Sequence, residues 1–304
     1  MGFPPEVRDE LAAMADDRVS GATALVLRGI GLLRKTSADP ELLRRTARAL
    51  LECQPTMAGF ATACALTVTA RDPRHVLEAL EHRVRRAPSA IARNAAAIAQ
   101  LRRSSPDPLR VVTCSRSAAV EQTLLVLQAQ GPLRVSCSKS CPQQEGVQLA
   151  ERLLQAGVDV GLHSDAGLSS AIPGADALVV GADAVSDSGF INKVGTAALA
   201  ALAGVSEVPV LVLAGPEKVI PDEIFARLPI REGPASEIAG AVGEPLVSAA
   251  RNPYFERIPG ELISYLVTDA GVLPAGAVQA GLWTPGAVEQ YLSLIKSYNM
   301  LDKS

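Results

Sequence analysis

The sequence of 304 residues lacks any long hydrophobic run. No uninterrupted apolar stretch reaches the ~20 residues of a membrane-spanning helix, and residues 1–10 lack a hydrophobic signal core. It also lacks a charge excess, because 32 acidic and 29 basic residues leave a net charge of −3 and no general attraction to nucleic acid or anionic membrane. Regular disulfide spacing is missing as well, since the five cysteines are odd in number and irregularly placed. These absences exclude disordered, fibrous, membrane and disulfide-stapled classes and leave a cytoplasmic α/β or all-α protein.

Residues 6–104 show the periodicity of helices. From Glu41 to Cys53, leucines and alanines recur at helical spacing with arginines on the opposite face. A second helical pattern begins at Val76, pauses near Pro88 and resumes over residues 91–101. The segment 103–108, which holds two serines and two prolines, has the composition of a linker. We therefore predict a helical N-terminal domain over residues 1–104 and a second domain over residues 105–304.

After residue 108 the pattern changes to short β-branched runs that alternate with helical segments. Predicted strands cover residues 110–113, 133–136, 158–163, 177–180 and 208–213, and predicted helices cover residues 117–130, 145–156 and 196–202. Helices of this length between strands require right-handed parallel crossovers, which predicts an α/β fold with a Rossmann-like, mostly parallel open sheet. Such sheets bind ligands beyond the carboxyl ends of their strands, so the functional site is expected there. An amphipathic helix within residues 283–304 is expected to dock on the body or on a partner subunit.

Polar or reactive side chains follow four of the predicted strands. The segments are Thr-Cys-Ser-Arg-Ser at 113–117, Cys-Ser-Lys-Ser-Cys-Pro at 137–142, His-Ser-Asp at 163–165 and Gly-Ala-Asp at 181–183. Each residue alone fits a structural or capping role, whereas their convergence on one rim predicts a site. Asp183 stands out because Asn192 and Lys193 follow it just before a predicted helix N-terminus, where free backbone N–H groups favour anions. Asp183 can act as a general acid or base if burial raises its pKa; alternatively, it only forms an ion pair with Lys193.

The thiols at the strand ends raise the separate possibility of a metal site. Cys114, Cys137, Cys141 and His163 offer the thiolate and imidazole ligands that suit zinc. None of them forms a Cys-x-x-Cys pair, and the three residues between Cys137 and Cys141 are an unspecific spacing. We therefore expect unmetallated thiols, no bound metal and no cofactor.

The run Gly-Ala-Asp at 181–183 with Gly-Phe-Ile-Asn-Lys-Val-Gly-Thr at 189–196 resembles the signature of a known family. That family joins methylthioribose-1-phosphate isomerase, ribose-1,5-bisphosphate isomerase and the alpha, beta and delta subunits of translation initiation factor 2B. Further segments that resemble its motifs, in the same order along the chain, are residues 17–22, 54–56, 113–117, 140–146, 208–218, 252–259 and 268–272. The resemblance covers most of the chain and makes this sequence a divergent member.

The resemblance implies two catalytic positions, because an aspartate and a cysteine are the proposed proton-transfer groups of the family's isomerases. The aspartate corresponds to Asp183, and the cysteine position holds Ser115. Cys114 lies one residue earlier, where the family commonly has histidine. A serine hydroxyl titrates far above a thiol, whose pKa is ~8.5, so Ser115 cannot simply replace a proton-shuttling cysteine. Adjacent residues leaving a strand point in different directions, so Cys114 is not an automatic substitute. The candidate catalytic residues are therefore Asp183, Ser115 and Cys114.

The resemblance also implies a substrate-binding set. Asn192, Lys193 and Lys218 correspond to ligand contacts, whereas positions that carry phosphate-binding arginines in the isomerases hold Ser20, Gln54 and Cys141. Each lost bidentate arginine contact is normally worth ~1.5–3 kcal/mol, which argues against a bisphosphate held in the usual way. Arg18, Arg116, Lys139, Lys193 and Lys218 could supply a rearranged anion site. The full set of candidate substrate-binding residues is Ser20, Gly21, Ala22, Gln54, Arg116, Ser117, Cys141, Asn192, Lys193 and Lys218.

Two functions follow from these residues. The first is a sugar-phosphate aldose–ketose isomerase that acts on a pentose phosphate or a related sugar-bearing compound. The second is a non-catalytic, ligand-sensing or assembly protein similar to the regulatory subunits of initiation factor 2B, a role that tolerates the missing cysteine and arginines. Either function implies a small-molecule sugar phosphate or nucleotide as ligand and, by family resemblance, a homodimer built largely through the C-terminal domain.

Overall fold

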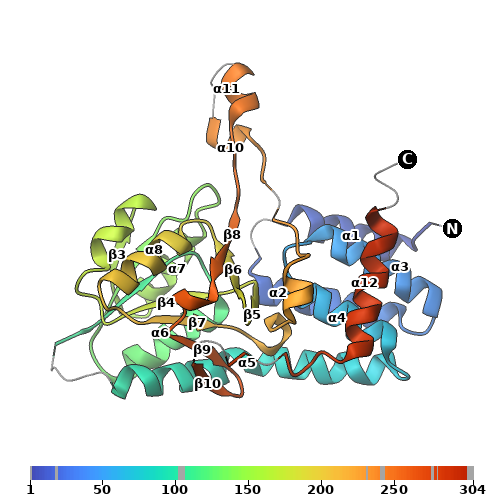
Figure 1. Cartoon of the computed structure of the whole chain (residues 1–304), viewed down its shortest axis with the longest axis horizontal. Helices are drawn as coiled ribbons and strands as arrows, with labels where there is room; N and C mark the ends of the chain where they lie inside the picture. The colour runs from blue at the N-terminus through green and yellow to red at the C-terminus, as the bar shows by residue number, and fades with distance from the viewer. Residues whose placement is uncertain are drawn as a thin grey trace.

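The computed structural model describes residues 2–17, 20–101, 107–230, 232–239, 244–274, 277–278 and 280–299. Its N-terminal part is helical, as the periodicity predicted (Figure 1). The helices are α1 (Pro5–Asp16), α2 (Ala22–Thr36), α3 (Pro40–Cys53), α4 (Ala58–Thr69) and α5 (Pro73–Leu101). In α3 the apolar face of the amphipathic pattern buries Leu43 and Leu50, and the Asp39 carboxylate caps the first turn by accepting from the Glu41 N–H at 2.9 Å. The nearly uniformly apolar α4 is buried among α2, α3 and α5.

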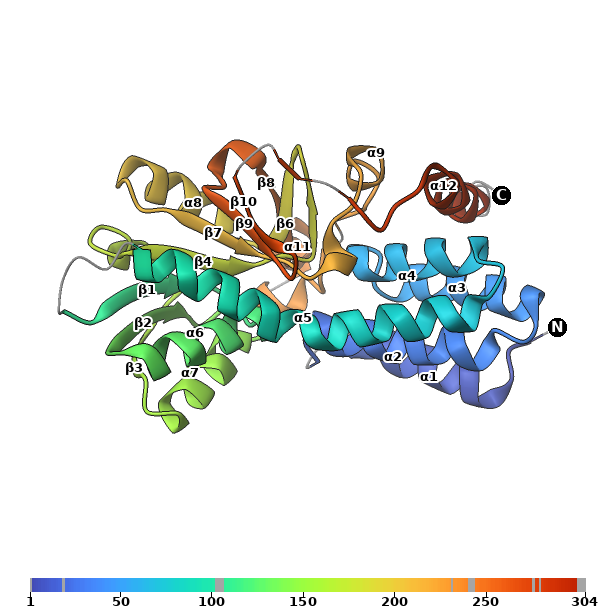
Figure 2. The ribbon, with the colours of Figure 1, turned by 90° about the horizontal axis from the view of Figure 1, so that it is seen from below.

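Helix α5 differs from the prediction, because it runs through Pro88 without a pause. Proline removes one helical hydrogen bond, to the carbonyl of Val84, and that loss is normally enough to end or bend a helix. Here each half of α5 is held by a different core. Leu77 and Leu80 pack with the N-terminal helices, whereas Ile91 and Ala95 pack beneath the sheet. Figure 2 shows α5 spanning the underside of both parts of the molecule.

The C-terminal part contains the expected open sheet, in the order β10-β9-β7-β4-β1-β2-β3. Its seven strands are the five predicted ones and two that were not predicted, β9 and β10. Neighbouring strands are parallel except for β9 and β10. The strands are β1 (Leu109–Thr113), β2 (Leu133–Ser138), β3 (Asp159–His163), β4 (Ala177–Gly181), β7 (Val210–Leu213), β9 (Tyr265–Thr268) and β10 (Gly271–Pro274). The chain proceeds from β1 to β2 and β3 on one side and then returns to β4 on the other. The boundary between β1 and β4 is therefore the topological switch point, where sheets of this kind bind ligands.

Helices cover both faces of the sheet (Figure 2). The second half of α5, α6 (Ala118–Gln130) and α7 (Glu145–Gln155) lie on one face, and α8 (Thr196–Val205) and the short 3-10 helix η1 (Ala166–Ala171) lie on the other. Successive strand residues point to opposite faces, so Val111 packs with the first group and Val112 with the second. Burial on both faces explains why the strands read as continuous apolar runs. The predicted fold class, helical N-terminal region and mostly parallel sheet, is confirmed.

A second, three-stranded antiparallel sheet was not predicted. It consists of β5 (Ala184–Ser186), β6 (Gly189–Lys193) and β8 (Phe255–Pro259), in the order β5-β6-β8. From its sequence, the end of β6 is predicted only as the approach to a helix. Its main partner β8 lies more than 60 residues further along the chain, beyond the reach of local patterns. Strand β6, which ends in Asn192 and Lys193, lies beside the carboxyl end of β4, where the Asp183 N–H donates to the Ile191 carbonyl at 2.8 Å.

The remaining elements are short helices and the C-terminal helix. The 3-10 helix η2 (Pro216–Lys218) contacts α4 and α5. Two short turns are α9 (Asp222–Phe225) and η3 (Gly260–Leu262). The short helices α10 (Ser236–Ala239) and α11 (Glu244–Ala249) form an arm that projects from the body (Figure 1). Helix α12 (Pro285–Asn299) returns to the helical part and packs on α4, where the indole Nε1–H of Trp283 donates to the Thr62 hydroxyl at 3.1 Å. The C-terminal helix thus docks on the body of its own chain.

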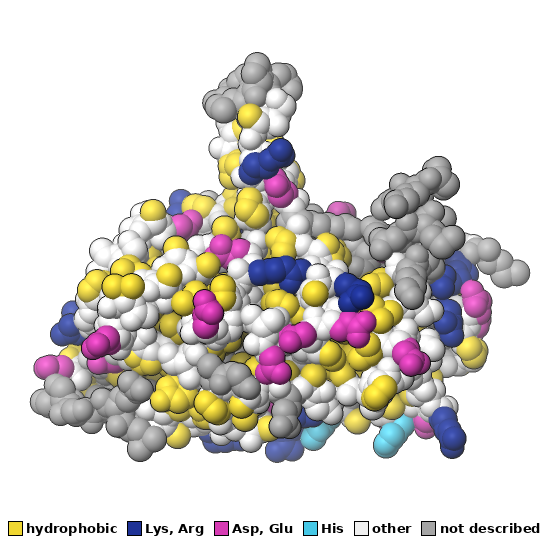
Figure 3. Space-filling model, viewed as in Figure 1, with side chains coloured by type: hydrophobic (Ala, Val, Ile, Leu, Met, Phe, Trp, Pro, Cys, Tyr) yellow, Lys and Arg dark blue, Asp and Glu magenta, His cyan; other side chains and the backbone are white. Residues whose placement is uncertain are grey.

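On the face shown in Figure 3, acidic and basic side chains are interspersed over both parts of the molecule. Within the described residues, none of the helices combines the length and the apolar composition that crossing a bilayer requires.

Candidate functional site

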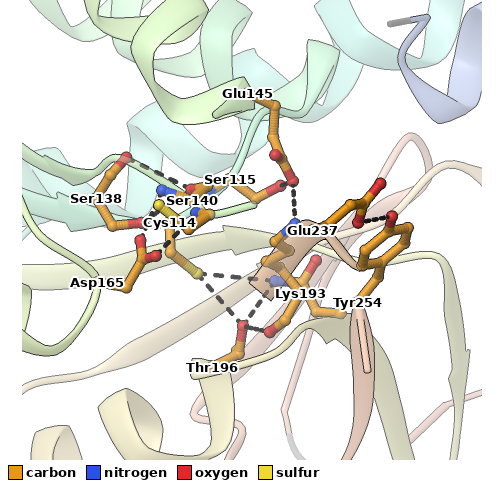
Figure 4. Close-up of polar contacts among 12 residues, drawn as sticks. Cys114, Ser115, Ser138, Ser140, Glu145, Asp165, Lys193, Thr196, Glu237 and Tyr254 are labelled. Carbon is orange, nitrogen blue, oxygen red and sulfur yellow. Dashed lines mark hydrogen bonds and ion pairs between the residues drawn. The ribbon is translucent and has the colours of Figure 1, made fainter. Parts of the chain in front are cut away.

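The loops after β1, β2 and β3 meet at one edge of the sheet, as the strand-end pattern predicted. The backbone N–H of Ser115 donates to the Ser140 hydroxyl at 2.8 Å. The Asp165 carboxylate, from the loop after β3, accepts from the backbone N–H groups of Ser140 at 2.6 Å and Cys141 at 2.8 Å. Asp165 therefore orders the β2 loop and is held by the backbone (Figure 4).

Backbone geometry at this edge is unusual in two ways. Ser115 and Ser140 both have left-handed backbone angles, with φ of 62° and 63°. Non-glycine residues in this region cost of order 1 kcal/mol and gather at ligand sites. Segments of the backbone also approach one another closely. A Cβ on Gly146 would overlap the Ser138 carbonyl oxygen, and a Cβ on Gly181 would lie 2.7 Å from the Ser117 Cβ. Glycine at these two positions lets the strand-end loops pack against one another.

Two adjoining cavities lie between the helical part and the sheet edge. The smaller, of about 120 Å³, opens over the ends of β1 and β4, and the larger, of about 440 Å³, extends toward Gln54 and the base of the arm. Asp183 lines both cavities. The smaller cavity is lined by Ser20, Gly21, Ala22, Thr23, Ser115, Arg116, Ser117, Ala118, Gln143, Glu145, Gly181, Ala182, Asp183, Asn192, Lys218 and Phe255. The cavity thus occupies the switch point between β1 and β4.

Asp183 is fixed by its backbone, and within the described part of the chain no side chain forms an ion pair with its carboxylate. Its N–H donates to the Ile191 carbonyl at 2.8 Å, and its carbonyl accepts from the Ala58 N–H at 3.1 Å. Burial raises the pKa of the Asp183 carboxyl, Lys218 opposes the rise, Glu145 adds to it and Lys193 again opposes it. Among the described residues no cation lies within 4.0 Å of this carboxylate, so the structure gives no support to the alternative in which Asp183 only pairs with Lys193. The raised pKa suits the Asp183 carboxyl to donate or accept a proton.

Lys193 instead forms an ion pair with Glu145, at 2.8 Å between Nζ and Oε1. Lys193 is only 3 % exposed, and its ammonium also lies over the Tyr254 ring at 5.4 Å from the centroid. The Ser115 hydroxyl donates to the same Glu145 oxygen at 3.2 Å. Figure 4 shows Ser115, from the loop after β1, and Lys193, at the end of β6, both reaching Glu145.

Glu145 is the principal site residue that the sequence analysis left out of its candidate set. It begins α7, where an acidic side chain is usually explained by the helix dipole. The signal was present, because Glu145 is part of the segment 140–146 that carried the family resemblance. Gln143 and Phe255, which line both cavities, were also missed.

Cys114 and Asn192 form a buried polar cluster with Thr196 below the cavity floor. The Cys114 sulfur lies 3.3 Å from the Thr196 hydroxyl, and the Asn192 amide donates to that hydroxyl at 3.0 Å. Burial raises the pKa of the Cys114 thiol to about 11, so it is neutral at pH 7. Asn192 lines the smaller cavity, whereas Cys114 does not.

The remaining candidates divide by position. Ser20, Gly21, Ala22, Arg116, Ser117 and Lys218 line the smaller cavity, and Gln54 lines the larger one. Arg116 is hydrogen-bonded to Gln148, and the Gln54 amide donates to the Met14 carbonyl at 3.2 Å. Cys141 is exposed and lies outside both linings, and Lys193 is buried beneath the site. Arg18 lies outside the described residues.

The strand-end thiols do not assemble into a metal centre in the part of the chain that the structure describes, where no group of three metal-ligating side chains occurs. Cys137 is buried in β2, and burial raises the pKa of its thiol to about 11, whereas Cys141 is exposed on the neighbouring loop.

Fold and site together define a doubly wound α/β protein with a polar cavity at its switch point, closed on one side by a helical part. Residues 16–275 match the model of the initiation factor 2 subunit family, and the chain belongs to this family. Divergent membership, expected from the sequence motifs, is thus confirmed.

Relatives in the family include named enzymes. The chain is 31 % identical to the ribose 1,5-bisphosphate isomerase of Methanocaldococcus jannaschii over 53 % of both chains. It is 34 % identical to the methylthioribose-1-phosphate isomerase of Desulforudis audaxviator, over 55 % of this chain and 53 % of that one. The chain thus spans about half the length of the curated isomerases it matches.

Other relatives are named for translation initiation. A putative eIF-2B subunit 2-like protein of Pyrococcus furiosus is 28 % identical over 89 % of this chain and 97 % of its own. The solved eIF-2B structure from Pyrococcus horikoshii covers 91 % of this chain and all of its own, with a TM-score of 0.79 and 22 % identity. The tetrameric eIF2B-beta2-delta2 complex of C. thermophilum gives a TM-score of 0.69 at 17 % identity, over 91 % of this chain and 94 % of its own. These two structural matches establish the fold.

Proposed function

We propose that this chain is an aldose–ketose isomerase of a pentose phosphate or a related sugar-bearing compound. The observation that carries the proposal is Asp183: burial raises the pKa of its carboxyl, it lines both cavities, and it shares the lining of the smaller one with Ser115 and Glu145. An aldose–ketose interconversion requires proton transfer to and from neighbouring oxygens, and a carboxyl whose pKa is raised by burial is suited to that transfer. Named isomerases among the relatives support the same reading.

The ligand's anionic group would bind where positive charge and free hydroxyls meet. Arg116 and Lys218 line the smaller cavity together with Ser117, at the carboxyl ends of β1, β4 and β7. These two cations are enough for one phosphate, whereas Ser20 and Gln54 add no charge where the isomerases are expected to carry arginine. A monophosphorylated sugar therefore fits the described residues better than a bisphosphate.

The test is turnover by the purified protein, followed by NMR, with ribose 1,5-bisphosphate, methylthioribose 1-phosphate and ribose 5-phosphate as candidate substrates. We expect conversion of at least one aldose to its ketose, and a loss of ~10²–10⁴-fold in Asp183→Asn. Asp9→Asn, an exposed carboxylate on α1, is the matched control and should keep full activity. Absence of turnover on every candidate, or full activity in Asp183→Asn, would refute the proposal.

A second function is favoured by a different observation: among the described residues, Cys53 is the only cysteine that lines either cavity. By family resemblance, the position of the isomerases' catalytic cysteine is Ser115. A non-catalytic, ligand-sensing or assembly protein needs no such thiol, and the relative matched over nearly its whole length is named eIF-2B-like. This role predicts that sugar phosphates or nucleotides raise the melting temperature without being converted. We propose, for either function, a cytoplasmic homodimer, which light scattering would test.

A further inference from the structure

Ser115 is held so that its proton faces away from a ligand. Its hydroxyl donates to Glu145 Oε1 at 3.2 Å, which leaves only oxygen lone pairs for the cavity that Ser115 lines. A hydroxyl in this state accepts a hydrogen bond from a ligand O–H. Serine alone is too weak a base to take that proton, because its own pKa is far above neutrality. A carboxylate behind it removes this limitation, as a general base does for other nucleophilic or proton-shuttling hydroxyls.

Charge around Glu145 is balanced in a way that suits proton sharing. Lys193 pairs with it at 2.8 Å from below, and Asp183 lines the same cavity. The cations that line that cavity, Arg116 and Lys218, are left for an anionic ligand. Because one carboxyl gives up a proton while the other takes one up, the net charge of the site stays constant, and Lys193 lies beside the carboxylate that takes the proton.

We infer that Ser115 and Glu145 act as one proton-accepting pair in place of a thiol, opposite Asp183 as the proton donor. This inference rests on the proposed isomerase function. Ser115 is the residue that touches the substrate, and Glu145 is a positioning residue that acts through Ser115.

The proton transfers balance in a single step. The O–H bond of the hydroxyl next to the substrate carbonyl breaks, its proton forms a bond to Ser115 Oγ, and the Ser115 proton passes to Glu145 Oε1. The freed electron pair forms the new C=O bond, while the hydrogen on that carbon moves with its electron pair to the neighbouring carbonyl carbon. The old carbonyl oxygen takes the proton of Asp183. The aldose becomes a ketose and leaves Asp183 ionised and Glu145 protonated. After the ketose leaves, Asp183 takes a proton from solvent and Glu145 releases one to solvent, which restores both groups for the next turnover.

The test uses the full chain and the sugar phosphate that the wild type converts. We expect Glu145→Gln and Ser115→Ala each to lower kcat by ~10²–10⁴-fold, with little change in KM, because both remove proton transfer rather than binding. The double variant should be no worse than either single variant, since the two residues act as a unit. Glu151→Gln, an exposed glutamate on the same helix, is the control and should match the wild type.

Rescue separates this role from a structural one. Ser115→Cys in the Glu145→Gln background should recover at least tenfold in kcat, because a thiol beside an unpaired Lys193 can hold the proton itself. Ser115→Ala leaves the Glu145–Lys193 ion pair in place, so it tests the pair even if Glu145→Gln folds poorly. Glu145→Gln within threefold of wild type, full activity in Ser115→Ala, or absence of rescue would overturn the inference while leaving the isomerase proposal standing. A wild type that converts no candidate overturns both.

Discussion

The ion pair between Glu145 and Lys193 makes a quantitative prediction about stability. Lys193 is 3 % exposed and Glu145 21 %, so breaking the pair leaves a charge that water reaches poorly. At 2.8 Å the direct Coulomb attraction is about 6 kcal/mol for an effective dielectric constant near 20, and desolvation of both groups offsets much of it. We expect Lys193→Met to lower the free energy of unfolding by ~2–4 kcal/mol, because the Glu145 carboxylate then lacks its counterion.

A double-mutant cycle isolates the pair. Glu145→Gln alone should also cost ~2–4 kcal/mol, whereas Lys193→Met with Glu145→Gln should cost less than the sum of the two single variants by ~1.5–3 kcal/mol. Denaturant unfolding followed by circular dichroism measures all four proteins, and unchanged slopes against denaturant confirm that the same transition is observed. Costs that add to within 0.5 kcal/mol would show that the two side chains do not stabilise each other, and the assigned geometry would be wrong.

Three further predictions concern packing, protonation and thiol exposure. Gly146→Ala should lower the melting temperature by several degrees, because the added Cβ would overlap the backbone of Ser138. The control Gly31→Ala adds a Cβ in open space on a helix and should keep or raise the melting temperature. Equal melting temperatures for the two variants would contradict this prediction. Because burial raises the pKa of Asp183, its neutral form favours the folded state, so the stability that Asp183 contributes is fully present below pH ~4 and is lost as the pH rises through its folded pKa. Asp183→Asn should lose that fall, as unfolding measured between pH 4 and 7 would reveal. Cys141, which is exposed, should react first with a thiol reagent in the native protein, and Cys64, which is fully buried, only after unfolding; mass spectrometry of the labelled peptides decides the order.

Local sequence determined the elements of this protein that carry their own signal. Alternation of β-branched runs with helices predicted the parallel sheet, since strands buried on both faces and joined by helices admit few other arrangements. The same periodicity placed Asp183, Ser115 and Arg116 at strand ends, and the strand-end rule placed them on one rim. Motifs at 140–146 and 181–196 identified the family. These features depend on neighbours along the chain, which is why the sequence sufficed.

Tertiary structure alone decided which of these side chains meet. Lys193 could have paired with Asp183, but the pairing of β6 with the distant β8 turns it toward Glu145, and Asp183 remains available to the cavity. Pro88 did not end its helix because two separate cores hold the two halves of α5. Whether Cys114 or Ser115 faces the ligand was likewise undecided by the sequence, since adjacent residues at a strand end diverge. Contacts between segments tens of residues apart settle such questions, because burial and charge pairing are properties of the assembled site rather than of any local stretch of chain.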